Sequence, residues 1–102
     1  MTSFELLSDL ANQKTDGIFI SGDKKNGEYK QWYSNGRLFV HCSYKNGKRD
    51  GEYKKWHDNG RLWKHCFYKN GELNREYKTW FSNGRLYSHY ILKNGKIVKR
   101  YV

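Results

Sequence analysis

The stretch YKNGKRDGEYKKWHDNGRL, from Tyr44 to Leu62, decides the fold, because the chain spells it almost again as YKNGELNREYKTWFSNGRL from Tyr68 to Leu86. The repeat unit is 24 residues long, and it fits the 102-residue chain as full repeats at 27–50, 51–74 and 75–98, with a partial repeat at each end. A short unit that recurs at a fixed period indicates an array of similar supersecondary units.

Each repeat contains two Asn-Gly pairs, as at Asn35-Gly36 and Asn46-Gly47. Asn-Gly between alternating segments favours a hairpin, since both central residues of a type I′ turn need positive φ. Consecutive hairpins form a meander. The predicted fold class is mainly β, a single-layer antiparallel β-meander of about eight strands built from 24-residue hairpin repeats. The expected strands cover 17–21, 27–33, 37–45, 51–57, 61–69, 75–81, 85–93 and 96–102.

The segment before the meander has a different pattern. TSFELLSDLANQ spaces its apolar residues as a helix does, and Thr2 and Glu5 have the spacing of a capping box. Because repeat arrays need a terminal cap, we predict a short N-terminal capping helix here. The predicted organisation is a helical cap over 1–16 followed by a repeat array over 17–102.

The turns predict which side chains share a face of the sheet. If Asn35-Gly36 is a two-residue turn, Trp32 faces Phe39, and side chains alternate outward from that pair. We call the two sides the tryptophan face, defined by Trp32, Trp56 and Trp80, and the tyrosine face, defined by Tyr29, Tyr53 and Tyr77. The tryptophan face is then expected to carry a ladder of aromatic pairs, which is the predicted interaction surface. Its members are Trp32, Phe39, Trp56, Trp63, Trp80 and Tyr87.

The same register places Leu38, Cys42 and Tyr44 on the tyrosine face. The predicted register also shifts each residue by two positions along the strand relative to the equivalent residue of the next repeat. Such an offset coils a sheet as in a barrel wall, unless bulges in segments such as GKRDG at 47–51 cancel it.

The formal net charge of +10 suits anionic partners, namely nucleic acid, a membrane surface or an acidic protein. Arg37 and Arg61 have an alternative interpretation, because they could simply cover the rings of Trp56 and Trp80 through cation–π contacts. The candidate anion-binding residues are Arg37, Lys45, Lys48, Arg49, Lys54, Arg61, Lys93, Lys96, Lys99 and Arg100.

The repeat resembles the MORN repeat, in the variant form found in bacteria and in giant DNA viruses of amoebae. The resemblance covers about 17–102 and rests on the Gly-x-Tyr openings at Gly27 and Gly51, the Asn-Gly-Arg-Leu turns, and the Tyr-Lys-Asn-Gly turns at Tyr44 and Tyr68. It implies an elongated single-layer meander, often dimeric, that works as a scaffold or binding module. Some members of the family have been proposed to bind lipid head groups.

The last full repeat departs from this pattern. The opening glycine is replaced by Arg75, and the tyrosine is lost at Ile91-Leu92. If the chain is viral, the resemblance implies the cytoplasm or nucleus of an infected host.

Two His-Cys pairs, His41-Cys42 and His65-Cys66, invite a metal interpretation. Strand alternation sends the two side chains of each pair to opposite faces, so we predict no metal site. The cysteines lie two strands apart, roughly 9–10 Å, which exceeds the limit for a disulfide. We therefore expect free thiols in a reducing, intracellular compartment. No nucleophile–base arrangement recurs, so we predict no enzyme, no cofactor and no small-molecule substrate.

Three functions remain in competition. The first is a protein-interaction scaffold, expected to be a homodimer with a further, unidentified protein partner, because a single sheet cannot bury two aromatic faces by itself. The second is nucleic-acid binding, since aromatic residues interleaved with lysine and arginine resemble a stacking platform. The third is attachment to an anionic membrane through the basic turns. Recurrence of these residues at the structural period favours the scaffold.

Overall fold

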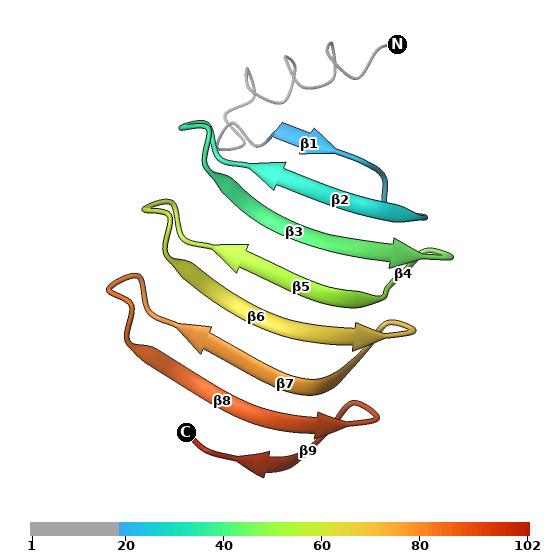
Figure 1. The fold of residues 1–102 in the computed structure, drawn as a ribbon, viewed down its shortest axis with the longest axis vertical. Coiled ribbons are helices and arrows are strands. Elements are labelled where there is room, and N and C mark those ends of the chain that lie inside the picture. Colours follow the sequence, from blue (N-terminus) through green and yellow to red (C-terminus); the bar gives the residue numbers. More distant parts are fainter. Residues whose placement is uncertain (1–18) are drawn as a thin grey trace.

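The structure is a computed structural model that describes residues 19–102. Its Cα atoms span 45 × 35 × 17 Å. In this part of the chain the fold is mainly β, a single antiparallel meander in which successive strands lie side by side, except that β4 and β5 follow each other along β3 (Figure 1). The predicted helix over 1–16 lies outside the described residues.

The described residues form nine strands in one sheet, ordered β1-β2-β3-β5-β6-β7-β8-β9, with β4 paired to β3. We expected about eight strands, and the extra one arises because Asp50 interrupts the ladder between β4 and β5. The strands are β1 (Phe19–Ser21), β2 (Gly27–Trp32), β3 (Leu38–Lys45), β4 (Lys48–Arg49), β5 (Gly51–Trp56), β6 (Leu62–Lys69), β7 (Glu72–Trp80), β8 (Leu86–Lys93) and β9 (Lys96–Arg100).

The turn at Asn46-Gly47 confirms the hairpin prediction. Asn46 and Gly47 have φ values of 53° and 80°, as a two-residue type I′ turn requires, and Lys45 pairs with Lys48 across it. The turns at Asn70-Gly71 and Asn94-Gly95 repeat this conformation.

The turn at Asn35-Gly36 corrects the prediction. Only Gly36 has positive φ, at 86°, and the backbone N–H of Tyr33 donates to the carbonyl of Arg37 at 2.8 Å. The loop between these partners therefore has three residues rather than two. The side chain of Asn35 accepts the N–H of Arg37 at 2.9 Å, so this Asn closes the turn with its side chain.

The longer turn shifts the pairing next to it by one residue. Trp32 pairs with Leu38, not with Phe39, and a bulge then restores the predicted pairing of Gln31 with Val40. The same shift occurs in the next two hairpins, where Trp56 pairs with Leu62 and Trp80 pairs with Leu86. The predicted pairs Trp32–Phe39, Trp56–Trp63 and Trp80–Tyr87 are therefore wrong.

The bulge also moves side chains between faces. Phe39 packs against the cluster around Tyr29, and its ring lies 4.6 Å from that of Tyr33, so it belongs to the tyrosine face. Leu38, which we expected on the tyrosine face, pairs with Trp32 on the tryptophan face. The predicted ladder of six aromatic residues is therefore divided between the two faces. Trp32, Trp56 and Trp80 lie on the tryptophan face, and Phe39, Trp63 and Tyr87 lie on the tyrosine face.

A second bulge cancels the expected stagger. Tyr44 pairs with Arg49 beside the turn, but farther along Val40 pairs with Lys55 and His41 with Lys54, so the register changes between Arg49 and Lys54. Gly51 stands at this bulge with a φ of 96°, and Arg75 takes the equivalent position with a φ of 68°. The sheet can therefore stack its repeats level, with Cys42 beside Tyr53.

The core lies on the tyrosine face. Tyr29, Val40, Cys42, Tyr53 and Cys66 form one buried cluster, in which Cys66 is completely inaccessible to solvent. Both cysteines are free thiols, as predicted. Burial raises the pKa of Cys66 to about 11, which keeps it protonated and unreactive at neutral pH.

Candidate functional site

Each hairpin carries one Glu–His–Lys group on the tryptophan face. Nε2 of His65 donates to Glu52 at 2.7 Å, and Nζ of Lys54 lies 3.8 Å from the same carboxylate. The hydrogen bond from His65, followed by the charge of Lys54, lowers the pKa of Glu52 below its ordinary value. Lys54, a predicted anion-binding residue, thus already has an anionic partner within the chain. The equivalent His–Glu contacts are His41–Glu28 at 2.9 Å and His89–Glu76 at 2.7 Å.

The predicted arginines of this face bind the next turn. Nη1 of Arg37 lies 3.4 Å from the carbonyl of Asp58, and Arg61 donates to the carbonyl of Asn83. Arg37 lines a shallow hollow of about 440 Å³ with Trp56. These contacts join successive repeats, which favours a structural role for both arginines.

The other predicted basic residues are dispersed. Lys45, Lys48, Lys93 and Lys96 flank the type I′ turns at the strand ends. Arg49 is half-buried on the tyrosine face, where its guanidinium lies 4.9 Å from the ring of Tyr53 and 5.3 Å from that of Tyr68. Arg49 therefore acts as a packing residue.

Two C-terminal residues contact rings. Nζ of Lys99 lies 4.9 Å from the ring of Tyr101, and the guanidinium of Arg100 lies 5.0 Å from that of Tyr90. The structure does not gather the predicted basic residues into one site.

A column of paired rings runs along the tyrosine face. The ring of His57 stacks on Trp63 at 4.7 Å with an interplanar angle of 12°, whereas Tyr33 meets Phe39 one repeat earlier at 4.6 Å with a tilt of 46°. In the last repeat the ring of Tyr87 meets only the edge of Phe81, at 4.9 Å and 63°. Tyr87 is 61% exposed and is the most open aromatic residue of the column.

Beside this column stands a pair of lysines that the sequence analysis missed. Lys55 in β5 pairs directly with Lys64 in β6, and both side chains are half-buried. Nζ of Lys55 lies 4.2 Å from the ring of Trp63, and Nζ of Lys64 lies 5.3 Å from that of Tyr77. Desolvation, and then the charge of Lys64, lowers the pKa of Lys55. Two positive charges thus share an aromatic surface.

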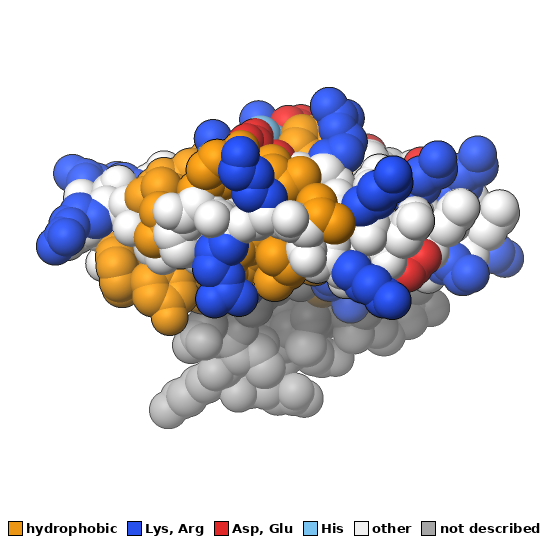
Figure 2. Space-filling view, turned by 90° about the horizontal axis from the view of Figure 1, so that it is seen from below, with side chains coloured by type: hydrophobic (Ala, Val, Ile, Leu, Met, Phe, Trp, Pro, Cys, Tyr) orange, Lys and Arg blue, Asp and Glu red, His pale blue; other side chains and the backbone are white. Residues whose placement is uncertain are grey.

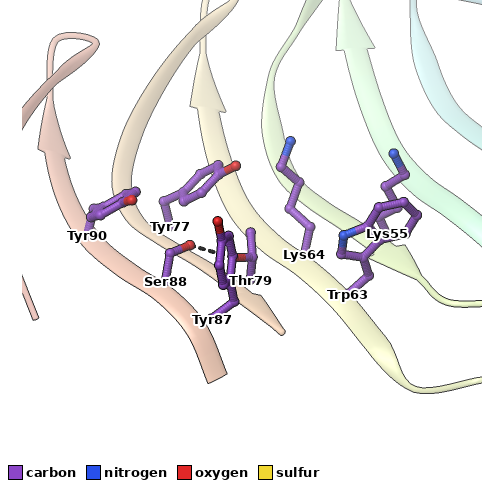
Figure 3. A pocket seen from close by; sticks show the side chains of 8 residues that line it. All are labelled: Lys55, Trp63, Lys64, Tyr77, Thr79, Tyr87, Ser88 and Tyr90. Atoms are coloured by element: carbon purple, nitrogen blue, oxygen red, sulfur yellow. Dashed lines mark hydrogen bonds between the residues drawn. The ribbon is translucent and has the colours of Figure 1, made fainter. Parts of the chain in front are cut away.

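The lysine pair forms one wall of a cavity of about 320 Å³ (Figure 3). On the opposite side, Thr79 and Ser88 form a hydrogen bond at 2.5 Å, with Tyr77, Tyr87 and Tyr90 around them. Among the described residues, none that lines the cavity is acidic. The described lining is Lys55, Trp63, Lys64, Tyr77, Thr79, Tyr87, Ser88 and Tyr90.

A signal for the lysine pair was present in the sequence. At the equivalent positions the first repeat has Gln31 and Val40, and the third has Thr79 and Ser88. Lys55 and Lys64 therefore do not recur at the repeat period, whereas every position chosen for the ladder is aromatic in all three repeats. Recognising them as one site required the true register, which brings the column of rings to their face.

The fold and the periodic contacts define a class of protein, an open β-sheet array of hairpin repeats. Within this class, the model of the MORN repeat variant family matches residues 25–46 and 49–70. No curated protein matches the chain significantly.

Residues 19–102 hold no cluster of three or more His, Cys, Asp or Glu side chains that could bind a metal ion. The same residues contain no helix that is long and apolar enough to cross a membrane.

Proposed function

We propose that the protein is a non-enzymatic interaction module that works as a scaffold and forms a homodimer. The two matches to the MORN repeat variant and the open single-layer sheet support a repeat-based interaction role. The free, buried thiols agree with a reducing intracellular location.

The observation that carries this proposal is the apolar surface at the C-terminal end of the sheet. Val98, Tyr87 and Phe81 are among the most exposed large hydrophobic residues. Figure 2 views the molecule from the β9 end and shows hydrophobic side chains gathered there among lysines and arginines. Exposed apolar patches of this kind usually form interfaces. This surface includes both faces of the sheet end, since Leu86 lies on the tryptophan face and Tyr87 on the tyrosine face. The exposed set from the end of β7 onward is Phe81, Leu86, Tyr87, Ile97, Val98, Tyr101 and Val102.

The basic residues around this patch give a homodimer a distinctive salt dependence. Lys96, Lys99 and Arg100 lie on β9, an edge strand, and would approach their copies across a two-fold contact. Salt screens the repulsion between like charges, so the dimer should strengthen as salt is added.

Sedimentation velocity tests the homodimer at about 50 and about 200 mM salt. We expect a dimer at micromolar concentration that tightens at the higher salt, and a monomer for Val98→Lys. The matched control is Ser34→Lys. It makes the same change in charge at an exposed residue of the turn between β2 and β3, near the β1 end of the sheet. Sedimentation of the wild type as a monomer at both salt concentrations would refute the homodimer.

Nucleic-acid binding is a second candidate function, favoured by the lysine pair beside exposed rings. Attachment to an anionic membrane has weaker support, because the basic turns lie at the strand ends of successive repeats. Nucleic-acid binding should weaken as salt is added, whereas the dimer should strengthen.

A further inference from the structure

The starting observation is an unfavourable arrangement that the fold does not require. Like charges directly opposite each other on neighbouring strands destabilise a sheet, and Lys55 and Lys64 occupy such positions. The rings of Trp63 and Tyr77 hold the ammonium groups in place but do not neutralise them. Because no carboxylate among residues 19–102 lines the cavity, the two charges have no anionic partner there within the described part of the chain.

The neighbouring repeats show that the fold can do without these charges. Gln31 and Val40 occupy the same pair of positions in the first repeat, and Val40 belongs to the buried core. Thr79 and Ser88 occupy them in the third repeat and satisfy each other by a hydrogen bond. A local conflict that only one repeat carries points to function rather than to folding.

The cavity also offers a flat ring beside the charges. Phe39 and Trp63 are each covered by Lys55, whose Nζ lies 5.2 Å and 4.2 Å from the two ring centres. Tyr87 occupies the third position of this column, and no cation–π contact is found at its ring among the described residues. A planar ligand could therefore stack on Tyr87 without displacing a side chain of the lysine pair.

The positive surface continues from the cavity toward the edge of the sheet. Tyr90 lines the cavity, and the guanidinium of Arg100 lies 5.0 Å from its ring. A ligand that carries several negative charges in a row could thus follow the face from the lysine pair to β9.

We propose that this cavity binds single-stranded nucleic acid, with a phosphate held by Lys55 and Lys64 and a neighbouring base stacked on Tyr87. Single strands combine a charge on every nucleotide with an accessible base face, and proteins bind them with basic grooves and aromatic platforms. A duplex hides its base faces, and an acidic peptide would leave the ring of Tyr87 without a planar partner. This assignment rests on the second candidate function and names its site.

The test uses fluorescence anisotropy with a fluorescein-labelled oligothymidylate of about ten nucleotides. The variant Lys55→Gln/Lys64→Val introduces the residues that the first repeat has at these positions, so we expect it to fold as the wild type does. Circular dichroism checks that the variant is folded. It should bind at least about ten-fold more weakly at about 50 mM salt, and the slope of log K against log salt should fall by about 0.7, which corresponds to the loss of one neutralised phosphate. The matched control, Lys54→Gln/Lys78→Gln, removes the same charge from the opposite face and should bind almost as the wild type does.

Tyr87→Leu tests the base platform. It should weaken oligothymidylate binding by roughly ten-fold, while binding to phosphatidylserine vesicles stays unchanged. Equal losses for the two double-lysine variants would overturn the site and leave nucleic-acid binding as diffuse charge attraction. Absence of oligothymidylate binding at low salt would overturn the second candidate function as well. Equal affinity for a duplex, or vesicle binding with the same dependence on Lys55 and Lys64, would also overturn the assignment.

Discussion

The first and second repeats have the same scaffold but different surfaces. In both, a tyrosine of the opening strand pairs with a buried cysteine, Tyr29 with Cys42 and Tyr53 with Cys66. In both, the same three-residue turn changes the register so that the tryptophan pairs with a leucine, Trp32 with Leu38 and Trp56 with Leu62. The two repeats differ two residues farther along the opening strand. There the first repeat has Gln31 opposite Val40, and the second has Lys55 opposite Lys64.

This comparison separates two kinds of residue in a repeat protein. Side chains that recur at the period build turns, core and the contacts between repeats. Side chains that break the period on an exposed face are the candidates for binding, because the scaffold does not explain them. Substitutions at equivalent positions of the two repeats can test both parts.

The largest effect is expected for the buried tyrosines. Tyr53→Ala should lower the free energy of unfolding by about 3–5 kcal/mol, as loss of a large buried aromatic side chain does. Tyr29→Ala should cost somewhat less, because of the two tyrosines only Tyr53 also supports the guanidinium of Arg49, which lies 4.9 Å from its ring. Urea denaturation measures both values. A loss below about 1 kcal/mol for Tyr53→Ala would mean that this face is not the core.

The turn glycines should give the next largest effect. Gly36 and Gly60 both have φ near 90°, so valine is strained at either position. A Cβ on Gly60 would also lie 3.3 Å from Nη1 of Arg37, whereas Gly36 has open space. We expect Gly60→Val to cost about 2 kcal/mol and more than Gly36→Val. Gly60→Asn is the control, because asparagine tolerates positive φ. Melting temperatures equal to the wild type for both valine variants would contradict the assigned turn.

The carboxylates of the tryptophan face predict a smaller, pH-dependent effect. The folded pKa of Glu52 is lowered by His65, so its stabilisation is present above the ordinary value of 4.5 and is lost as the pH falls through the lowered value. The carboxylate is half exposed and screened, so the contribution is about 1 kcal/mol or less. Thermal unfolding between neutral and acidic pH should therefore show a flatter profile for Glu52→Gln. An unchanged profile would mean that the His65 contact does not form in solution.

The smallest effect on stability is expected where the repeats differ most. In Lys55→Gln/Lys64→Val, relief of charge repulsion offsets lost ring contacts, so the free energy of unfolding should change by less than about 1 kcal/mol. The stability of the wild type should also rise more with added salt than that of the variant, because salt screens the pair. A large loss of stability would show that the lysines hold the sheet together.

Much of the fold was predictable because the repeat sets the strands and the Asn-Gly pairs set the hairpins. The sequence could not distinguish the two turn types, because both contain Asn-Gly. Asn46 adopts positive φ itself, whereas the side chain of Asn35 accepts a hydrogen bond from the backbone N–H of Arg37. The same dipeptide thus encodes loops of different length. That one-residue difference sent Phe39 and its equivalents to the other face, which hid the environment of Lys55.

The most direct test of the account is a titration of ¹⁵N-labelled protein with the unlabelled oligothymidylate, followed by amide chemical shifts. The account predicts saturable shifts concentrated at Lys55, Lys64, Tyr87 and Ser88, with little change at Trp32, on the opposite face. Shifts concentrated on the tryptophan face, or small shifts spread evenly over the basic turns, would contradict it.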